Sequence, residues 1–574
     1  MTTVPPLARR WLAPGAPDAA AARRLAGELR LPEPLCRLLV ARGHDAPGAA
    51  RAFLRPSLDM LHDPRLLAGV DRAVDRIRAA IRSGETILVH GDYDVDGMCA
   101  AALYTRVLRR MGATVVPFVP HRVHDGYDLG PGGVRRASEV GAGLILTADC
   151  GIVAHDAVEA ARQVGIDVIV TDHHTPGSTL PDAVAVVNPR RHDCRYPDPS
   201  LSGTGVAYKL SLALARSAGV PDEEVHYFLD LVALATVADV MPLRGENRVM
   251  TRIGLRVLGE SRNAGLRALV HSSGLAGKPL SAGHLSHVLA PRLNAVGRLE
   301  DAATGLRLLL SGDGDADALA AGLEEVNARR KAVDREILEQ AIELLDGYDA
   351  DRDRAVVLAR AGWHPGVIGI VASRVVERLH RPAVLISIPE GGGVARGSAR
   401  SIPGFDLLEA VRACGEHLER FGGHRAAAGF DIRPDRIAAF REAFAAAARA
   451  RLPEAPVPEL RLDGELTLGE VTPDLVRYMA YAGPFGPGNP TPVFALRRLR
   501  VEAVKAVGQG GQHLKLRLAE GDRSLDAIGF RMAESHGAVA RSGEPVDVAA
   551  RLEEDHWNGR RRLQAKLVDL RPAR

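Results

Sequence analysis

Short aliphatic runs that end in acidic or histidine clusters constrain this chain more than any other feature. The runs are residues 87–89 (ILV), 144–146 (LIL) and 168–170 (VIV), and each is typical of a buried parallel strand. The clusters that follow them are HGDYDVDG (90–97), TADCG (147–151) and TDHH (171–174). Because ligands bind beyond the carboxyl ends of the strands in an open α/β sheet, the clusters can converge in one pocket.

A fourth cluster, TVAD at residues 236–239, ends the apolar run 231–238. A buried, unpaired carboxylate at Asp239 would be costly, so we expect a metal or another cation beside it. Carboxylates with two imidazoles and no thiolate suit a pair of divalent ions such as Mn²⁺ or Mg²⁺. The four clusters together therefore predict a metal site for phosphate ester chemistry.

In the first cluster, Asp94 and Asp96 are two residues apart in a loop between a strand and a helix, so each is expected to hold a different ion. Gly97 allows a tight turn, and the helix N-terminus adds positive potential. Asp92 is expected to bind metal or to orient the other ligands. Taken alone, this loop is equally compatible with a calcium-type acidic turn, although the downstream Glu of an EF-hand is missing.

The adjacent His173 and His174 follow the third run. Adjacent side chains on a strand face opposite ways, so one is expected to bind metal while the other reaches the scissile phosphate as an acid or a donor. Asp149, at the end of the second run, would alone most often be a helix cap. Its position beside the other clusters favours a ligand.

The composition limits the possible classes of protein. With 574 residues the chain is too long for one core, so three or four domains are expected. We find no membrane-spanning segment and no signal peptide. The five cysteines show no paired spacing, which favours a reducing cytoplasm over disulfides or structural zinc. Because the net charge is only +3, a nucleic-acid partner would need a local basic channel.

Changes of pattern along the chain predict an α/β protein with a doubly wound, mostly parallel sheet, a smaller α/β domain and an antiparallel β-barrel. Apolar residues at three- and four-residue spacing from Leu319 to Leu344 indicate a long connecting helix. The expected parts are an N-terminal helical segment (1–80), the metal-binding domain (81–311), the connecting helix (312–346), the smaller α/β domain (347–452) and an OB-fold barrel (453–574).

The chain resembles the DHH phosphoesterase superfamily, and within it the RecJ single-strand-specific exonucleases. The four acidic and histidine clusters indicate the superfamily. Later motifs point to the RecJ family, because small oligonucleotide and cyclic-dinucleotide phosphodiesterases end after the GGH motif. These motifs are LSGTGVAYKL (201–210), ATVADVMPL with GENR (235–248), PRLNAVGRL (291–299), WHPGVIGIVASR (363–374), RGSARS (396–401), FGGHRAAAG (421–429) and GPFGPGNPTPVF (483–494).

The resemblance implies roles for individual residues. His174 would lie beside the phosphate or leaving group and Asp92 would support the metal site, which makes these two the expected catalytic residues. The metal ligands would be Asp94, Asp96, Asp149, His173 and Asp239. The smaller α/β unit resembles the DHHA1 substrate domain, and arginines suit bidentate phosphate binding. The expected substrate-binding residues are Arg292, Asn294, Arg298, Ser398, Arg400, Gly422, Gly423 and His424. If the metal clusters were absent, we would interpret these segments as glycine-rich turns with surface arginines.

The activity implied by the resemblance is 5′-to-3′ degradation of single-stranded DNA to 5′-mononucleotides by two-metal phosphodiester hydrolysis, in DNA repair and recombination. It also implies a cytoplasmic monomer without membrane contact, with a single-strand-binding protein or a RecQ-type helicase as possible partners. The barrel would extend the path of the strand through basic and aromatic groups. Its candidates are Lys505, His513, Lys515, Trp557 and Arg560.

Three positions depart from the family's usual EDGYGLS segment, which here reads HDGYDLG (124–130). His124, Asp128 and Gly130 put substrate contacts at this segment in doubt. Ala235 stands where a Gly is usual before TVAD, a change that affects packing more than chemistry. All the expected metal ligands are present.

Three alternatives remain open at this stage. A small-substrate phosphodiesterase, acting on oligoribonucleotides or cyclic dinucleotides, or an inorganic pyrophosphatase would share the metal site, but the extra barrel argues against both. A non-catalytic DNA-replication scaffold is disfavoured by the intact ligands. An RNA-degrading enzyme is the hardest to exclude, because nothing in the sequence visibly reads or rejects a 2′-OH.

Overall fold

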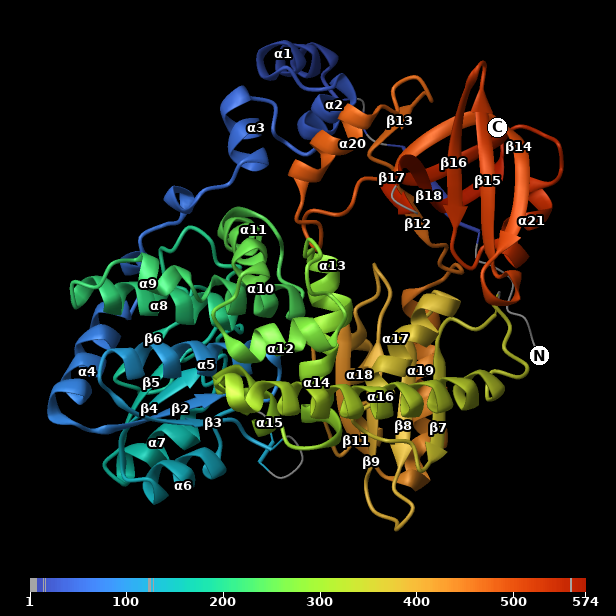
Figure 1. The fold of residues 1–574 in the computed structure, drawn as a ribbon. Helices are drawn as coiled ribbons and strands as arrows, with labels where there is room; N and C mark the ends of the chain where they lie inside the picture. Colours follow the sequence, from blue (N-terminus) through green and yellow to red (C-terminus); the bar gives the residue numbers. More distant parts are fainter. Residues whose placement is uncertain are drawn as a thin grey trace. The chain divides into compact units, whose positions relative to one another are not determined.

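The structure is a computed structural model that describes residues 8–13, 15, 17–121, 125–126, 128–350, 352–557 and 560–573. The chain forms two compact units (Figure 1). The metal unit, named for the clusters described above, contains residues 51–328 and 481–491. The second unit contains residues 1–50, 329–480 and 492–574.

A five-stranded, all-parallel sheet forms the centre of the metal unit, with the strand order β3-β2-β4-β5-β6. Its strands are β2 (Thr86–Gly91), β3 (Thr114–Phe118), β4 (Ala142–Ala148), β5 (Asp167–Thr171) and β6 (Ala185–Val187). The inner strands are buried along almost their whole length, which explains their continuous apolar runs. The strand order reverses between β2 and β4, and such a switch point is where α/β sheets bind ligands.

Helices cover both faces of this sheet, as the alternation of strand and helix patterns predicts. One face packs against α4 (Val70–Ser83), α5 (Val95–Arg110) and α8 (Gly203–Ser217). The other face packs against α6 (Pro131–Glu139) and α7 (His155–Gln163). The doubly wound α/β fold is therefore confirmed.

Helices also complete the metal unit on the side of α8. Helix α10 (Leu229–Ala238) is apolar on all sides because it is buried between α5, α8 and α11 (Gly245–Gly259). The other elements are η1 (Leu58–Met60), η2 (Pro64–Leu66), α9 (Glu223–His226), α12 (Ala264–Ser272), α13 (Ala282–His284), η3 (Leu285–Leu289), α14 (Ala290–Leu299) and α15 (Ala303–Leu310).

The long helix expected from the apolar spacing is α16 (Asp313–Glu343), which begins in the metal unit and ends in the second unit. Among the described residues, no helix has both the length and the apolar character that a membrane span requires.

The second unit contains a five-stranded mixed sheet of order β10-β11-β9-β8-β7, in which only β7 and β8 are parallel. Aromatic side chains of Phe430, Phe440 and Phe444 fill the core between this sheet and its helices. The elements are β7 (Val356–Ala361), α17 (Ile368–Leu379), β8 (Ala383–Ile388), β9 (Ala395–Arg400), α18 (Leu407–Arg412), η4 (Gly415–His417), β10 (Arg420–Gly423), β11 (Ala427–Ile432), η5 (Pro434–Arg436) and α19 (Ile437–Arg451).

The C-terminal strands form the expected barrel, in the order β13-β14-β15-β16-β18-β17, and pairing of β14 with β17 closes it. The pairings β13–β14 and β16–β18 are parallel and the others antiparallel. The elements are β13 (Gly464–Leu466), α20 (Pro473–Met479), η6 (Ala480–Ala482), β14 (Phe494–Val507), η7 (Gln509–Gly511), β15 (His513–Glu520), β16 (Arg523–Gly529), α21 (Ala533–Ala540), β17 (Val546–Trp557) and β18 (Arg560–Pro572).

The described residues before Arg51, the first part of the N-terminal segment, pack near the barrel within the second unit, whereas the rest of that segment belongs to the metal unit. Arg42 forms an ion pair with Asp463 at 2.7 Å, and the Trp11 indole donates to Asp569 at 2.6 Å. The elements are β1 (Arg10–Leu12), which pairs in parallel with β12 (Glu459–Arg461), then α1 (Ala19–Leu29), α2 (Glu33–Ala41) and α3 (Pro47–Leu54).

Candidate metal centre

The loop after β2 turns its carboxylates into the switch point by capping the next helix. Asp94 is the N-cap of α5, and its side chain accepts N–H bonds from Asp96 at 2.9 Å and Gly97 at 3.1 Å. A Cβ at Gly97 would collide with the backbone of Asp92. Only glycine therefore lets the helix begin so close to that residue.

The carboxylate of Asp96 is oriented by a second helix N-terminus. Its oxygens accept the N–H groups of Gly203 and Thr204, the first two residues of α8, each at 2.7 Å. These amides have no partner inside their own helix, and the helix dipole favours the negative charge. A Cβ at Gly203 would lie 2.5 Å from Oδ1 of Asp149, so this glycine also keeps the centre open.

Asp149 leaves β4 in the left-handed region, with φ +69°. A non-glycine residue is held there only when its surroundings determine the backbone, and such strain is concentrated at functional sites. The Asp149 amide donates to the Thr171 carbonyl at 3.1 Å, and the Thr147 hydroxyl donates to Cys150 O at 2.7 Å. These bonds fix the turn that presents Asp149.

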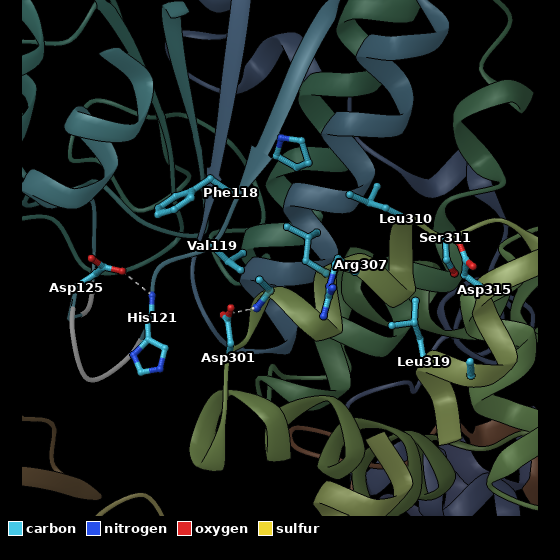
Figure 2. Close-up of a pocket in the computed structure, with 14 residues that line it drawn as sticks. Phe118, Val119, His121, Asp125, Asp301, Arg307, Leu310, Ser311, Asp315 and Leu319 are labelled. Atoms are coloured by element: carbon cyan, nitrogen blue, oxygen red, sulfur yellow. Dashed lines mark hydrogen bonds between the residues drawn. The ribbon is translucent and has the colours of Figure 1, made fainter. Parts of the chain in front are cut away.

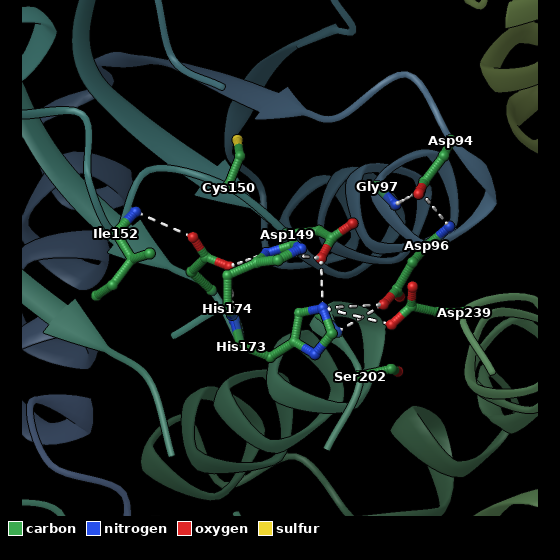
Figure 3. A network of polar contacts seen from close by, with 12 residues as sticks. Asp94, Asp96, Gly97, Asp149, Cys150, Ile152, His173, His174, Ser202 and Asp239 are labelled. Atoms are coloured by element: carbon green, nitrogen blue, oxygen red, sulfur yellow. Dashed lines mark hydrogen bonds and ion pairs between the residues drawn. The ribbon is translucent and has the colours of Figure 1, made fainter. Parts of the chain in front are cut away.

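His173 has the orientation of a metal ligand (Figure 3). Its Nδ1 lies 2.9 Å from the Leu201 carbonyl and donates to it, which leaves Nε2 with its lone pair toward the carboxylates. Nε2 lies 3.1 Å from Asp149 Oδ1, 3.5 Å from Asp239 Oδ2 and 3.9 Å from Asp96 Oδ2.

The expectation that His173 and His174 face opposite ways on a strand is wrong. Strand β5 ends at Thr171, and Asp172 Oδ1 accepts the backbone N–H of both histidines, at 2.7 and 3.0 Å, which turns the chain. Both rings consequently face Asp149 Oδ1, at 3.1 Å and 3.9 Å. Asp172 Oδ1 also accepts Nδ1–H of His174 at 2.8 Å.

Asp172 is a functional residue that sequence reasoning missed, although it belongs to the TDHH motif. Besides holding His174, its second oxygen accepts the Ile152 amide at 2.9 Å, so it joins the turn after β4 to the turn after β5. The available signal was an acidic residue directly before two histidines, which is a suitable place for an orienting carboxylate.

Asp239 reaches the centre from a helix, whereas the other three clusters follow strands. It is the C-cap of α10, and its amide donates to Ala235 O at 2.9 Å. The expected cation partner is consistent with this position, because Oδ2 of Asp239 is buried and has no hydrogen-bond partner in the part of the chain that the structure describes.

The carboxylates raise one another's pKa values. Burial first, and then the charges of Asp96, Asp94 and Asp239, raise the pKa of Asp149 well above its usual range. Burial with Asp96 and Asp94 raises the pKa of Asp239 to about 8. Burial lowers the pKa of His174, but the hydrogen bond and charge of Asp172 outweigh it and raise that pKa to about 9. A divalent cation would relieve this repulsion.

The donor set fits two metal ions. Asp149 Oδ1, His173 Nε2 and Asp239 Oδ2 are buried and lack a hydrogen-bond partner among the described residues. Oxygen and imidazole donors without thiolate suit Mn²⁺ or Mg²⁺. Three overlapping groups have ligand atoms within 4.8 Å of one another: Asp96–His173–Asp239, Asp92–Asp94–Asp149 and Asp149–His173–His174.

Helix α14 carries three predicted substrate residues and packs against the first cluster. A Cβ at Gly297 would lie 2.8 Å from the Tyr93 carbonyl, so this glycine allows the close approach. Arg292 is buried and pairs with Glu324 at 2.5 Å, while Asn294 and Arg298 are half-buried. Their contact with substrate stays a prediction.

The predicted residues of the smaller α/β domain share one sheet. Ser398 and Arg400 lie on β9, and Gly422 and Gly423 on β10, with His424 directly after. Strand β11 lies between them, and its Gly429 is in register with both Ser398 and Gly422. The Arg400 guanidinium donates to the Ser398 hydroxyl at 3.2 Å. The structure thus brings these residues together, and their binding role stays a prediction.

Three of the five barrel candidates have described side chains. Lys505 and Lys515 are directly opposite on β14 and β15, and His513 accepts the Arg531 amide at 3.0 Å. The side chains of Trp557 and Arg560 lie outside the described residues. Sequence reasoning missed Phe530, which is 52% exposed beside His513 at 5.1 Å between ring centroids.

Two of the departures from the family pattern have structural explanations. Asp128 has φ +76°, a left-handed value that favours Gly, and its carboxylate accepts the Gly151 amide at 2.5 Å. The side chain therefore supports the turn after Asp149. Gly130 is the N-cap of α6. His124 lies outside the described residues.

A separate cavity of about 790 Å³ opens beyond the carboxyl end of β3 (Figure 2). Phe118, Val119 and His121 line it from the strand side, and Arg307 and Leu319 line it from α15 and α16. Its lining contains none of the seven residues that could hold metal. The chemistry therefore lies at the switch point and not in this cavity.

Comparisons with known proteins agree with this geometry. The DHH family N-terminal domain matches residues 86–236, the DHHA1 domain matches 353–450 and the RecJ OB domain matches 462–569. The single-stranded-DNA-specific exonuclease RecJ of Dickeya dadantii is 37% identical over 574 residues, which cover 96% of this chain and 98% of the relative.

The chain belongs to the RecJ family. Two crystal structures of the family's member from Thermus thermophilus are similar to the whole fold. The complex with Mn²⁺ has a TM-score of 0.84 and 34% identity, covering 98% of this chain and 80% of that one. The complex with Mg²⁺ has a TM-score of 0.79 and 32% identity, covering 98% and 79%.

Proposed function

We propose that this RecJ-family chain is a single-stranded-DNA-specific exonuclease that releases 5′-mononucleotides by phosphodiester hydrolysis with two divalent ions, Mn²⁺ or Mg²⁺. The observation that carries the proposal is the convergence of seven acidic and histidine side chains at one switch point. The printed name of the Dickeya dadantii relative supports single-stranded DNA as the substrate. The two Thermus thermophilus complexes support the choice of metals.

Six of the seven side chains would hold the two ions in two groups. When bound, the ions polarise the phosphoryl oxygens and stabilise the charge that develops during hydrolysis. We assign Asp96, His173 and Asp239 to one ion and Asp92, Asp94 and Asp149 to the other.

The remaining residues orient the substrate and move its protons. Because Asp172 holds Nδ1 of His174, contact with a phosphate or leaving oxygen falls to Nε2. The Arg400 guanidinium and the Ser398 hydroxyl are suited to bind a phosphate. Gly422 leaves the backbone open for close approach, because a Cβ there would meet nothing within 4 Å, whereas Gly423 makes room for the Ala427 carbonyl of the neighbouring strand. Arg292, Asn294 and Arg298 would add contacts from α14.

Further features of the proposal rest on the resemblance and on the sequence. They are a role in DNA repair and recombination, a cytoplasmic monomer, and a single-strand-binding protein or a RecQ-type helicase as partner. The five-part division at residues 1–80, 81–311, 312–346, 347–452 and 453–574 also remains our proposal.

The deciding experiment is degradation of single-stranded DNA labelled at either end, with Mn²⁺, Mg²⁺ or a chelator. We expect mononucleotides from the 5′ end with either metal, and none with chelator or with Asp94→Ala. A duplex and an RNA strand of the same sequence serve as controls. Hydrolysis of dinucleotides alone, equal cleavage of RNA, or binding without hydrolysis would each contradict the proposal.

A further inference from the structure

The backbone that follows Asp239 is held by a segment almost 250 residues further along the chain. The amide of Leu243 donates to the Pro487 carbonyl at 2.7 Å, and Nε of Arg244 donates to the Gly488 carbonyl at 2.5 Å. Leu243 is fully buried. Residues 481–491, here called the strap, belong to the metal unit, although the chain continues from them into the barrel.

The strap contains a rigid turn that presents the Pro487 carbonyl to Leu243. The amide of Gly486 donates to the Asn489 carbonyl at 2.9 Å, and the amide of Asn489 donates to the Gly486 carbonyl at 3.1 Å. Pro487 and Gly488, with φ +73° at Gly488, are the residues that a type II turn requires at its centre. The buried Asn489 side chain donates to the carbonyls of Ala482 and Pro484, both at 2.9 Å.

A second anchor fixes the beginning of the strap to α11. The guanidinium of Arg248, which is 3% exposed, donates to Gly483 O at 2.8 Å and Tyr481 O at 3.2 Å. It also donates to Phe53 O at 2.9 Å and lies 3.9 Å from the centre of the Phe53 ring. A buried arginine with so many carbonyl partners holds the strap in one position.

The intrinsic backbone preference of Val240 does not favour the conformation that it adopts next to Asp239. Val240 has φ +59°, a strained conformation for a β-branched residue. Its side chain is 65% exposed, so its own packing offsets little of this strain. The Met241 amide closes the helix end by donating to the Thr236 carbonyl at 3.1 Å, and the contacts of Leu243 and Arg244 with the strap add a second restraint just beyond it.

The same loop is connected to the residues that orient His173. Nδ2 of the Asn247 side chain donates to Pro242 O at 3.2 Å and to Ser200 O at 2.5 Å. Ser200 precedes Leu201, whose carbonyl accepts the His173 Nδ1–H. The loop between Asp239 and α11 thus touches the supports of two proposed ligands.

We propose that the strap is a positioning element of the metal centre, and that it sets the affinity for the ion assigned to Asp96, His173 and Asp239. This inference rests on the proposed two-metal function. It gives a role to the GENR and GPFGPGNP motifs that the chemistry of the centre does not explain. The ion assigned to Asp92, Asp94 and Asp149 should depend on the strap much less.

The test is a Mn²⁺ titration of the full chain, with free Mn²⁺ measured by electron paramagnetic resonance. The variant is Gly488→Ala, because a Cβ there would lie 3.1 Å from Pro242 Cβ and push the turn away. The matched control is Gly277→Ala, at φ +71° with nothing within 4 Å of its Cβ. It carries the same backbone strain without the contact.

We expect two ions to bind to the wild type and to the control. In Gly488→Ala, one ion should bind about 10–100-fold more weakly while the other is unchanged, as for other groups that orient ligands. Arg244→Ala, which removes one bond at the surface, should give a smaller shift in the same direction and serves if Gly488→Ala does not fold. Adding Val240→Gly should restore part of the affinity, because glycine removes the strain at that position.

The outcomes separate this inference from the proposed function. A wild type that binds fewer than two ions overturns both. Two ions in the wild type, with unchanged binding in Gly488→Ala and Arg244→Ala, overturn the inference alone. Equal weakening of both ions in Gly488→Ala, or equal weakening in Gly277→Ala, also overturns it, because the effect would then reflect general instability.

Discussion

Asp172 Oδ1 lies 2.8 Å from Nδ1 of His174, and the same oxygen accepts the backbone amides of His173 and His174. One carboxylate therefore sets both the ring orientation and the local backbone. The Nδ1–H bond is how a carboxylate orients a general acid or base, which is the role proposed for His174.

Replacing Asp172 with Asn should separate these two roles. The Asn oxygen can still accept the amides, but it does not stabilise a charged imidazole, so we expect kcat to fall by about 10²–10⁴-fold. The stoichiometry of Mn²⁺ should remain at the wild-type value. The control is Asp182→Asn, an exposed carboxylate nearby. Loss of metal binding with unchanged kcat at saturating Mn²⁺ would contradict the orienting role.

Asp149→Asn should lower the activity of the protein and raise the stability of its metal-free form. Asp149 is buried among like charges, so replacing it with a neutral side chain removes repulsion in the metal-free protein. With chelator, the variant should unfold at a temperature several degrees above that of the wild type. With Mn²⁺, only the wild type should gain substantial stability, and the variant should lose at least about 10³-fold in kcat/KM. Thermal unfolding under both conditions checks this.

The three strand-end clusters could be predicted from sequence because their signal is local. An apolar run followed by Asp or His defines a strand end, and the parallel arrangement brings such ends together. For Asp239 the residues offered one signal, the cost of burying its charge. The helix before it has no amphipathic period that could indicate which face lies toward the metal centre. The direction of His174 could not be predicted, because it depends on the hydrogen bonds of Asp172 and not on strand alternation.

Contacts between distant segments were beyond sequence reasoning. The bonds from Gly203 and Thr204 to Asp96, and from Leu243 to Pro487, join segments more than 100 residues apart. Neither pair has a distinguishing residue type, because backbone amides make the contacts. Such partners appear only when the fold is known.

A buried ion pair supports α8, the helix whose N-terminus orients Asp96. Lys209 Nζ lies 2.5 Å from Glu246 Oε1, and neither side chain is more than 1% exposed. Lys209→Met would leave the buried Glu246 carboxylate without its cation, with only the hydrogen bonds from the His62 amide and the Tyr196 hydroxyl, so we expect a loss of about 3–5 kcal/mol in the free energy of unfolding. The double variant with Glu246→Leu should recover most of this loss. Denaturant unfolding of the wild type, the two single variants and the double variant gives the interaction energy. Equal stability of Lys209→Met and the double variant would rule out this account.

Asp230 should make stability depend on pH. Burial raises its pKa to about 6, against the hydrogen bond from Ser261 and the charge of Arg106 on α5. Between about pH 4 and 6, Asp230 is therefore protonated in the folded state and ionised in the unfolded state. The contribution of Asp230 to the free energy of unfolding falls as the pH rises through that range. The total fall in the free energy of unfolding that is due to Asp230 amounts to about 3 kcal/mol.

Asp230→Asn removes this titration. Relative to the wild type, the variant should be more stable at pH 7, and the difference should decrease toward pH 4. Denaturant unfolding of both proteins across this range measures the difference directly, so that other titrating groups cancel. A difference that does not vary with pH would contradict the raised pKa of Asp230.

The barrel bears a row of cations that is unfavourable without a partner. Lys505 and Lys515 are directly opposite each other, and like charges in that position destabilise a sheet. The row continues through Ile528 to Lys566, and the Lys566 ammonium lies 5.1 Å from the centre of the exposed Phe530 ring. Cations beside an exposed aromatic ring are typical of a surface that binds single strands.

Removing these groups should separate charge from stacking in DNA binding. Lys505→Ala and Lys515→Ala should each reduce the dependence of log Kd on log salt by about 0.7, the value of one single-strand phosphate contact. Phe530→Ala should instead weaken binding by about 1–3 kcal/mol without changing the salt slope, because stacking releases no counterions. Fluorescence anisotropy with single-stranded DNA at several salt concentrations measures both. The control is Arg541→Ala, at an exposed residue directly after α21. Equal slopes for Lys515→Ala and Arg541→Ala would show that this face of the barrel does not contact the strand.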